Sequence, residues 1–330
     1  MAEAERVDPN DLRIFSGRSN PALAEAIAQY LHIPLSPTRS RRFSDGNQQV
    51  QLGETVRSRV VLVVQSFSMP VADHLVELLL MLDAARGAGA REVHAIVPYY
   101  SFARSDKKDA PRISIAARLM ARMIQTAGAT NVMTMSLHSP QVHGFFDVPT
   151  DPLTARPCFE DYFRRQELRG TVVVAPDAGR ARSATRFATK LGLPVIVGSK
   201  TRISDREVRL TPFSMDLSAF ERAIIYDDEI AAGTSVIAMV ELLASHGIRE
   251  MRAVCTHGVF SGDALARLSA LPQLTEIIAS DTIDIPTQKR VPKLTVLSAA
   301  PLFGEAIRRN YLGQSIGDLF AFWEEFQAEA

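Results

Sequence analysis

Short runs of apolar, often β-branched residues alternate along this chain with longer segments in which apolar residues recur every three or four positions. The short runs predict buried strands at residues 60–64, 93–97, 132–135, 171–175, 195–197, 223–226, 251–256 and 294–298. The longer segments predict helices at residues 75–85, 113–127, 182–191 and 235–246. Strands and helices that alternate in this way build parallel sheets covered by helices on both faces, so we expect an α/β fold.

A proline-rich connection containing Pro149, Pro152 and Pro157 interrupts the alternation, which then starts again. The 330 residues of the chain are enough for two domains of ordinary size. We therefore expect two domains, each with a mainly parallel sheet flanked by helices. Ligands of such sheets bind at the carboxyl ends of the strands, so polar residues that follow a strand are the candidates for function.

The composition argues against several classes of protein. Lys plus Arg and Asp plus Glu number 37 each, so no net charge attracts nucleic acid or a membrane surface. Cys158 and Cys255 match no metal-binding or disulfide spacing, which favours a reducing cytoplasm. The polar N-terminus lacks the apolar core of a signal peptide, and the apolar run at 75–82 is too short to span a membrane. We expect a cytoplasmic protein without membrane or nucleic-acid partners.

The most informative candidate site follows the strand predicted at 223–226. Asp227 and Asp228 end the apolar run, and their carboxylates suit the hydroxyls of a sugar. The loop that leads into the next predicted helix consists of small and hydroxyl residues: Ala231, Ala232, Gly233, Thr234 and Ser235. The N-terminus of a helix presents unpaired backbone N–H groups, which suit a phosphate. The pattern predicts a sugar-phosphate site, although an ordinary strand-to-helix turn with capping residues would also explain it.

Two clusters follow predicted strands in the first half of the chain. After residue 97, two tyrosines precede a charged segment whose members suit a nucleotide base and its phosphates: Arg104, Ser105, Asp106, Lys107 and Lys108. After residue 135 comes His138, a candidate contact for a metal or a phosphate. A solvated charged loop and a structural histidine are the alternatives for these two clusters.

Two further clusters lie in the second half of the chain. Asp177 follows the strand at 171–175 and suits hydrated Mg²⁺ or a ribose hydroxyl, or serves only the turn. Lys200 and Arg202 are two residues apart in an extended segment and so face the same way. A loop that carries both cations could close over a polyphosphate, and an exposed polar hairpin is the alternative.

These motifs occur in the order of a known family, because the chain resembles ribose-phosphate diphosphokinase, also called phosphoribosyl pyrophosphate synthetase. The resemblance runs from about residue 14 to about residue 320. It rests on Phe-Ser-Gly at 15–17, Arg-Phe-Ser-Asp-Gly at 42–46, Val-Pro-Tyr-Tyr at 97–100, Leu-His at 137–138, Gly-Phe-Phe-Asp at 144–147, Pro-Asp at 176–177, Lys-x-Arg at 200–202, Asp-Asp at 227–228 and Thr-His at 256–257.

The resemblance implies a fold, an activity and an assembly. The expected fold is two phosphoribosyltransferase-type domains, residues 1–156 with 303–330 on the ATP side and residues 157–302 on the sugar-phosphate side. The expected activity transfers the diphosphoryl group of MgATP to the anomeric hydroxyl of ribose 5-phosphate and releases AMP. The expected cofactor is Mg²⁺, and the expected assembly is a homo-oligomer built from dimers, a hexamer in most of the family.

The resemblance also assigns roles to residues of this chain. Phe43 and Asp45, with Asn47 beside them, would reach the adenine site of a neighbouring subunit, and Arg104, Ser105 and Asp106 would bind ATP. His138 and Asp177 would lie at the metal, and Lys200 and Arg202 would stabilise charge around the attacked phosphorus. Asp227 and Asp228 would hold the ribose. The 5-phosphate would lie in the loop of Ala231, Ala232, Gly233, Thr234 and Ser235.

The chain departs from the family pattern inside these motifs. The family has Glu at Asn47, Gln at Ser105, Asp at Ser136, Gly at Arg180, Asp at Ala231 and Thr at Ala232. A catalytically impaired paralogue that regulates or assembles with an active enzyme therefore stays an alternative to the active enzyme. The length and Lys200-x-Arg202 argue against a phosphoribosyltransferase. Asp318 lies in the C-terminal segment that in the family helps bind phosphate or ADP, so we expect weak control by these anions.

Overall fold

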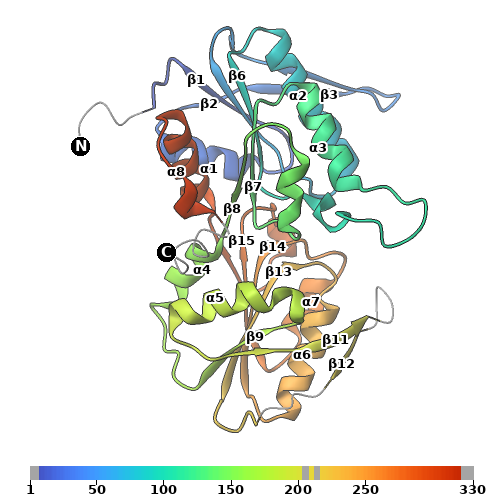
Figure 1. The fold of residues 1–330 in the computed structure, drawn as a ribbon, viewed down its shortest axis with the longest axis vertical. Coiled ribbons are helices and arrows are strands. Elements are labelled where there is room, and N and C mark those ends of the chain that lie inside the picture. Colours follow the sequence, from blue (N-terminus) through green and yellow to red (C-terminus); the bar gives the residue numbers. More distant parts are fainter. Residues whose placement is uncertain (1–6, 203–207, 212–215, 321–330) are drawn as a thin grey trace. The chain divides into compact units, whose positions relative to one another are not determined.

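The computed structural model describes residues 7–202, 208–211 and 216–320, which divide into two compact units. The first unit comprises the described residues of 1–154, 282–284 and 299–330, and the second comprises those of 155–281 and 285–298. Each unit contains a six-stranded sheet with helices beside it, which confirms the predicted α/β fold (Figure 1). The predicted functional domains, with their boundaries at 156 and 302, stay a prediction.

The sheet of the first unit is parallel throughout. Its order is β2 (Leu35–Ser36), β1 (Leu12–Ser16), β5 (Val60–Val64), β6 (Glu92–Val97), β7 (Asn131–Met135) and β8 (Thr150–Leu153). Every residue of β5 and β7 is buried, as expected for strands covered on both faces. The carboxyl ends of these strands therefore meet at one edge of the sheet.

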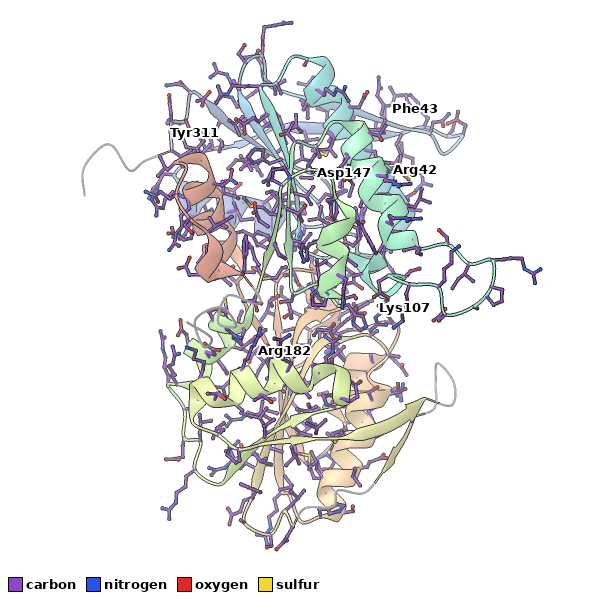
Figure 2. All side chains as sticks on the ribbon, in the orientation of Figure 1. Arg42, Phe43, Lys107, Asp147, Arg182 and Tyr311 are labelled. Atoms are coloured by element: carbon purple, nitrogen blue, oxygen red, sulfur yellow. The ribbon has the colours of Figure 1, made fainter. Side chains whose placement is uncertain are left out.

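An antiparallel hairpin of β3 (Thr38–Arg42) and β4 (Gln48–Leu52) is inserted between the second and third strands of this sheet along the chain. The hairpin extends away from the sheet and carries Arg42 and Phe43 near its turn (Figure 2). Val50 and Leu52 of β4 pack against the core of the unit, so one end of the hairpin is anchored and the turn is exposed.

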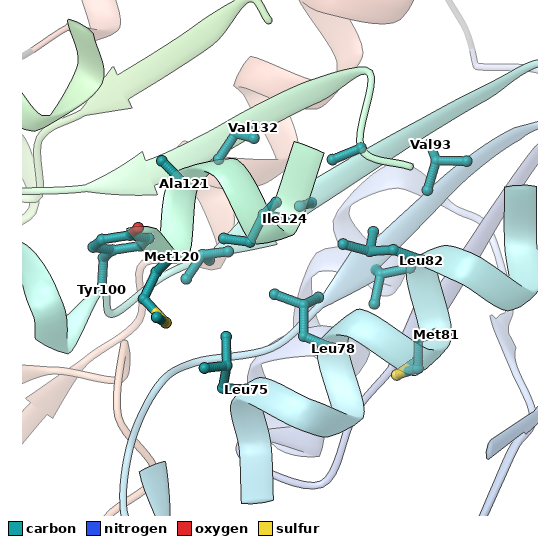
Figure 3. Packing of buried hydrophobic residues seen from close by; sticks show 14 of the residues in the cluster. Leu75, Leu78, Met81, Leu82, Val93, Tyr100, Met120, Ala121, Ile124 and Val132 are labelled. Carbon is teal, nitrogen blue, oxygen red and sulfur yellow. The ribbon is translucent and has the colours of Figure 1, made fainter. Parts of the chain in front are cut away.

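Four helices cover the first sheet: α1 (Pro21–Leu31), α2 (Val71–Gly87), α3 (Ala116–Ala127) and α8 (Ala300–Tyr311). Leu75, Leu78 and Leu82 of α2 face Met120 and Ile124 of α3 within one buried core (Figure 3). Each such side chain contributes about 1.5–3 kcal/mol by leaving water. Helices α1 and α8 lie side by side (Figure 1).

Gly304 allows α8 to approach α1, because a Cβ atom there would lie 2.3 Å from the ring of Tyr30. The chain after α8 then returns to the sheet, where Phe320 forms a bridge with Leu153 of β8. The C-terminal helix is thus part of the first unit, although it follows the second unit along the chain.

The second unit repeats the topology of the first. Its parallel sheet has the order β10 (Val195–Val197), β9 (Thr171–Ala175), β13 (Arg222–Ile230), β14 (Glu250–Gly258), β15 (Leu274–Ser280) and β16 (Leu294–Leu297). Its helices are α4 (Arg156–Phe163), α5 (Ala181–Leu191), α6 (Thr234–Ser245) and α7 (Ala264–Ser269). A second antiparallel hairpin, β11 (Ser199–Arg202) with β12 (Val208–Thr211), again follows the second strand of the sheet along the chain.

The predicted end of one strand is wrong. The apolar run predicted a strand at 223–226 with Asp227 and Asp228 in the following turn, but β13 continues to Ile230. Pairing continues because β14 is equally long, so that Asp227 lies opposite Cys255 and Glu229 lies opposite His257. The acid pair is therefore held by the sheet itself.

No helix among residues 7–202, 208–211 and 216–320 is both long and apolar enough to cross a membrane.

Candidate active site

The loop between β13 and α6 has the backbone that a phosphate site needs. Gly233 caps α6 with φ of 74°, a left-handed conformation that glycine adopts without strain. A Cβ atom at this position would also lie 3.3 Å from Leu268. The N–H group of Ile237 bonds to the carbonyl of Gly233 at 2.9 Å, and the N–H groups before it point out of the first turn. Thr234 and Ser235 occupy that turn, so the predicted phosphate loop does begin a helix.

Backbone hydrogen bonds from the segment that follows β14 hold the same loop in place. The N–H of Ser261 donates to the carbonyl of Ala231 at 3.0 Å, and the N–H of Phe260 donates to Ile230 at 3.0 Å. Ala231 and Ala232 therefore keep a defined backbone although they bring neither the carboxylate nor the hydroxyl of the family pattern. An anion bound at this loop could accept hydrogen bonds from backbone N–H groups and from the hydroxyls of Thr234 and Ser235.

The acid pair lies in β13, two residues before this loop. Asp227 accepts a hydrogen bond through Oδ1 from the N–H of Asp228 at 2.8 Å. Asp228 in turn forms an ion pair with Arg180, whose Nη1 lies 2.8 Å from Asp228 Oδ2. The two side chains of this ion pair are only 15% and 10% exposed. A residue that departs from the family pattern thus contacts one of the two predicted sugar-binding acids.

Asp177 and Arg180 belong to the turn that follows β9. Asp177 Oδ1 accepts a hydrogen bond from the N–H of Arg180 at 3.2 Å and so closes the short 3₁₀ turn Ala178–Arg180. Because β9 pairs with β13, this turn lies beside the acid pair at the carboxyl edge of the sheet. The second unit therefore brings Asp177, Asp227 and Asp228 to one edge, as the sequence predicted.

Lys200 and Arg202 lie on β11, opposite Leu210 and Val208 of β12. The side chains themselves lie outside the part of the chain that the structure describes, so their catalytic role stays a prediction.

In the first unit, the predicted ATP-binding residues Phe43, Asp45 and Asn47 form the turn of the β3–β4 hairpin. The N–H of Phe43 donates to the carbonyl of Asn47 at 2.8 Å. Asn47 donates to Asp45 through its backbone N–H at 3.0 Å and its side-chain amide at 2.8 Å. A glutamate at this position would place a second negative charge beside Asp45, whereas the amide donates to it.

The ring of Phe43 is available for stacking. It is 38% exposed, and the guanidinium of Arg41 lies 4.8 Å from its centre. An exposed aromatic ring paired with a cation is a suitable platform for a nucleobase. Arg42 is held lower on the hairpin, where its Nη1 lies 2.8 Å from Asp73 of α2.

The segments that follow β6 and β7 lie close together. Asp106 accepts a hydrogen bond from the hydroxyl of Ser139, the neighbour of His138. The structure thus brings Asp106 and the His138 segment together, as a shared nucleotide site would require. Arg104 ends the 3₁₀ turn Ser101–Arg104 at the start of the first segment.

Ser105 has a structural role beside its predicted one. Its hydroxyl donates to the carbonyl of Ser114 at 3.2 Å and accepts from the N–H of Ala116 at 3.3 Å, where α3 begins. The side chain therefore closes the loop between β6 and α3. Its predicted contact with ATP stays a prediction.

Glu77 was missed as a site residue, although it positions the hairpin. This buried carboxylate of α2 accepts hydrogen bonds from Arg18 at 2.9 and 2.8 Å, from Ser40 at 2.5 Å and from Gln65 at 2.8 Å. Burial raises the pKa of Glu77, but these donors outweigh it and leave the pKa below its usual range. Its signal in the sequence is a lone acid on the apolar face of a helix.

Asp318, which follows α8, forms an ion pair with Arg309, whose Nη1 lies 2.6 Å from Asp318 Oδ1. Arg309 also contacts Glu305, whose pKa falls to about 2, chiefly because Arg308 and then Arg309 donate hydrogen bonds to it. The predicted weak response to phosphate and ADP is untested, and this ion pair supplies an internal anion for Arg309.

The described residues contain no cluster of three or more His, Cys, Asp and Glu side chains arranged for a metal ion. Mg²⁺ usually binds one or two carboxylates together with substrate phosphates and water. The carboxylate of Asp177 suits such a site. His138 belongs to the first unit and Asp177 to the second, so their joint role at a metal stays a prediction.

Two family models match different parts of the chain. Residues 12–128 match the N-terminal domain of ribose phosphate pyrophosphokinase, and residues 216–321 match the phosphoribosyl synthetase-associated domain. A putative ribose-phosphate pyrophosphokinase from Streptomyces coelicolor is 46% identical over 310 residues, which cover 94% of this chain and 98% of that protein. A ribose-phosphate pyrophosphokinase from Deinococcus radiodurans is 43% identical over 314 residues, again with 94% and 98% covered.

A solved structure agrees with these relatives. Phosphoribosylpyrophosphate synthetase from Mycobacterium smegmatis superimposes with a TM-score of 0.85 at 35% sequence identity. The match covers 92% of this chain and 99% of that one. The relatives and this structure are similar over nearly the whole length, and the chain belongs to the ribose-phosphate pyrophosphokinase family.

Proposed function

We propose that this ribose-phosphate pyrophosphokinase binds ribose 5-phosphate at the second unit and MgATP at the first, and transfers the diphosphoryl group to the anomeric hydroxyl. The observation that carries the proposal is the acid pair at the end of β13, followed by Gly233 at the start of α6. The carboxylates suit the ribose hydroxyls, and the helix N-terminus suits the 5-phosphate.

The proposed reaction is a displacement at the β-phosphorus of ATP. The anomeric oxygen attacks that phosphorus, the bond from it to the oxygen shared with the α-phosphorus breaks, and AMP leaves with that oxygen. The hydroxyl proton is lost to solvent. Such transfers depend mainly on alignment and on neutralisation of charge. Lys200 and Arg202 would supply positive charge around the transferred group, while Asp227 and Asp228 orient the attacking sugar.

The ATP would lie against residues of the first unit. Arg104 would neutralise its phosphates, and the exposed Phe43 with Asp45 would contact the adenine of a neighbouring subunit in a dimer-based homo-oligomer. Asp177 and His138 are the residues that would contact Mg²⁺, which would supply positive charge against the phosphates of ATP. We propose a cytoplasmic enzyme whose partners are these substrates and further copies of the chain, without nucleic acid or membrane.

The test incubates purified protein with MgATP and ribose 5-phosphate and follows AMP and phosphoribosyl diphosphate by ³¹P NMR. AMP should form only when the sugar phosphate is present. AMP formed equally without the sugar, or no AMP from folded protein that binds both substrates, would contradict the proposal. If the protein alone forms no AMP, it is mixed with an active relative. AMP formation faster than that of the relative alone would identify a regulatory paralogue.

A further inference from the structure

Arg180 forms an unusually sheltered ion pair for a turn residue. Its Nη1 lies 2.8 Å from Asp228 Oδ2, and both side chains are at least 85% buried, since their exposed fractions are 15% and 10%. The backbone of Arg180 has φ of −97° and ψ of −9°, so a residue with a side chain fits here without strain. The arginine is therefore accommodated by the turn and directed to β13.

The surroundings of the ion pair are strongly acidic. Asp177, Asp227, Asp228 and Glu229 all lie at the carboxyl ends of β9 and β13. A phosphorylated sugar that binds at this edge brings further negative charge. The guanidinium of Arg180, in direct contact with Asp228, reduces this repulsion.

The layer beneath the ion pair is buried and well packed. Tyr226, which precedes the acid pair, is buried and stacks on Phe187 of α5 with ring centres 4.6 Å apart. A second buried ion pair, Arg156 with Glu160 at 2.9 Å, belongs to the charges that surround Tyr226. The turn of Arg180 leads directly into α5, so packing of this helix fixes the base of the arginine.

We propose that Arg180 is a positioning residue that orients the carboxylate of Asp228 toward the ribose hydroxyls and thereby sets affinity and hydroxyl selectivity for the sugar phosphate. The inference rests on the proposed function, because it assigns the sugar to this edge. The guanidinium holds one carboxylate oxygen of Asp228, and Asp227 holds the backbone N–H of the same residue, so both its side chain and its main chain are held before substrate arrives.

The main test compares Arg180→Gln and Arg180→Lys with the wild type. Hydrogen bonds between charged groups correspond to roughly tenfold or more in an equilibrium constant, so Arg180→Gln should raise the KM for ribose 5-phosphate about tenfold. The KM for ATP and kcat should stay within about twofold. Arg180→Lys keeps the charge and should restore most of the affinity. The preference for ribose 5-phosphate over 2-deoxyribose 5-phosphate should fall in Arg180→Gln.

The matched control is Arg222→Gln. Arg222 lies at the opposite end of β13 and forms an ion pair with Glu250 at 3.3 Å, so this variant also removes an arginine from an ion pair on the same strand. It should leave both KM values unchanged. An Arg180→Gln variant that behaves like Arg222→Gln, or that changes both KM values and kcat alike, overturns the inference.

A second comparison tests whether Arg180 acts through Asp228 or contacts the sugar phosphate directly. It can also be made if Arg180→Gln alone fails to fold. The double variant Arg180→Gln/Asp228→Asn leaves no unpaired buried charge and is compared with Asp228→Asn alone. Equal KM values for the sugar show that Arg180 acts through Asp228. A further tenfold rise in the double variant shows that Arg180 acts on the sugar phosphate itself and overturns the inference.

Failure of the proposed function is distinguishable from failure of this inference. Calorimetric titration with ribose 5-phosphate measures binding without turnover. Wild-type protein that binds the sugar but forms no AMP contradicts the proposed function, while weaker binding by Arg180→Gln than by Arg222→Gln still supports the inference. Equal binding by both variants overturns it whatever the activity.

Discussion

The two units have the same strand order and the same place for an inserted hairpin, yet their third strands end differently. In the first unit, β5 leads into Gln65 and Ser66, whose side chains are buried and bonded within the unit. In the second unit, the last residues of β13 include the acid pair, and the strand leads to a left-handed glycine that opens α6. A shared topology thus provides the same edge twice, and at the end of the third strand one unit carries a buried polar network while the other carries acids and a helix start.

The hairpins differ in a related way. In the first unit, Glu77 and the Arg42–Asp73 pair fasten the β3–β4 hairpin to α2. In the second, the β11–β12 hairpin carries the two cations expected to act on the transferred group and packs beside α6. We infer that one hairpin serves binding and the other serves chemistry.

Removal of a cation from the second hairpin should have the largest effect on activity. Lys200→Ala should lower kcat by about 10²–10³-fold, because it removes a charge that stabilises the transition state. The free energy of unfolding should change little. Steady-state AMP formation checks the first expectation and chemical denaturation the second. Lys190→Ala, at an exposed lysine near the end of α5, is the control, and equal activity of the two variants would refute the role of Lys200.

A substitution at Glu77 should loosen the attachment of the first hairpin to α2 and have the second largest effect. Glu77→Gln should lower the free energy of unfolding by about 3 kcal/mol, because buried donors lose a charged acceptor. The KM for ATP should also rise, since Ser40 and the hairpin lose their anchor. Asp83→Asn, at an exposed position of the same helix, should do neither. Urea denaturation and ATP kinetics measure the two effects, and a Glu77 variant as stable as the control would contradict this account.

The same carboxylate predicts a dependence on pH. The folded-state pKa of Glu77 is lowered, so its stabilisation is present above the unfolded pKa of about 4.3 and is lost as pH falls through the folded pKa. Wild-type protein should therefore lose stability more steeply than Glu77→Gln as the pH is lowered below about 4.3. Denaturation at a series of acid pH values measures the two slopes, and parallel slopes would disprove the assignment.

A smaller effect is expected at the helix start that distinguishes the second unit. Gly233→Ala should destabilise the protein by about 1–2 kcal/mol, because alanine is strained in the left-handed conformation. It should also raise the KM for ribose 5-phosphate. Gly247→Ala places the same strain at φ of 91° with open space around the Cβ atom, so it should cost stability without a change in KM. If the two variants had the same KM for ribose 5-phosphate, Gly233 would have no role in binding the phosphate.

The smallest effect concerns the exposed ion pair of the first hairpin. Arg42 and Asp73 are 54% and 27% exposed, and pairs of this kind contribute less than about 1 kcal/mol. Arg42→Gln should leave thermal unfolding almost unchanged and raise the KM for ATP by no more than about twofold. A loss of stability comparable with that of Glu77→Gln would show that the hairpin is held mainly by this pair.

Continuous apolar runs made much of the fold predictable. The strands Val60–Val64 and Thr171–Ala175 have the predicted bounds, because parallel strands buried on both faces need apolar side chains at every position. The short β8 was not predicted, since a polar start and Pro152 conceal it. Its pairing depends on β7 beside it, which no local pattern encodes.

The site was predictable in part for the same reason. Residues at strand ends could be assigned to one edge, and the acid pair, Asp177 and the helix start do lie there in the second unit. The Arg180–Asp228 pair and the donors to Glu77 join residues far apart along the chain. Such contacts depend on how turns and helices pack, so the sequence pattern could not reveal them.

The division of substrates between the units is tested most directly by the kinetics of Asp227→Asn and Phe43→Ala measured side by side. This account predicts that Asp227→Asn raises the KM for ribose 5-phosphate and leaves that for ATP unchanged, while Phe43→Ala does the reverse. The assignment of sugar phosphate to the second unit and ATP to the first would be wrong if both variants changed the KM for the same substrate. It would also be wrong if Asp227→Asn changed only the KM for ATP and Phe43→Ala only the KM for ribose 5-phosphate.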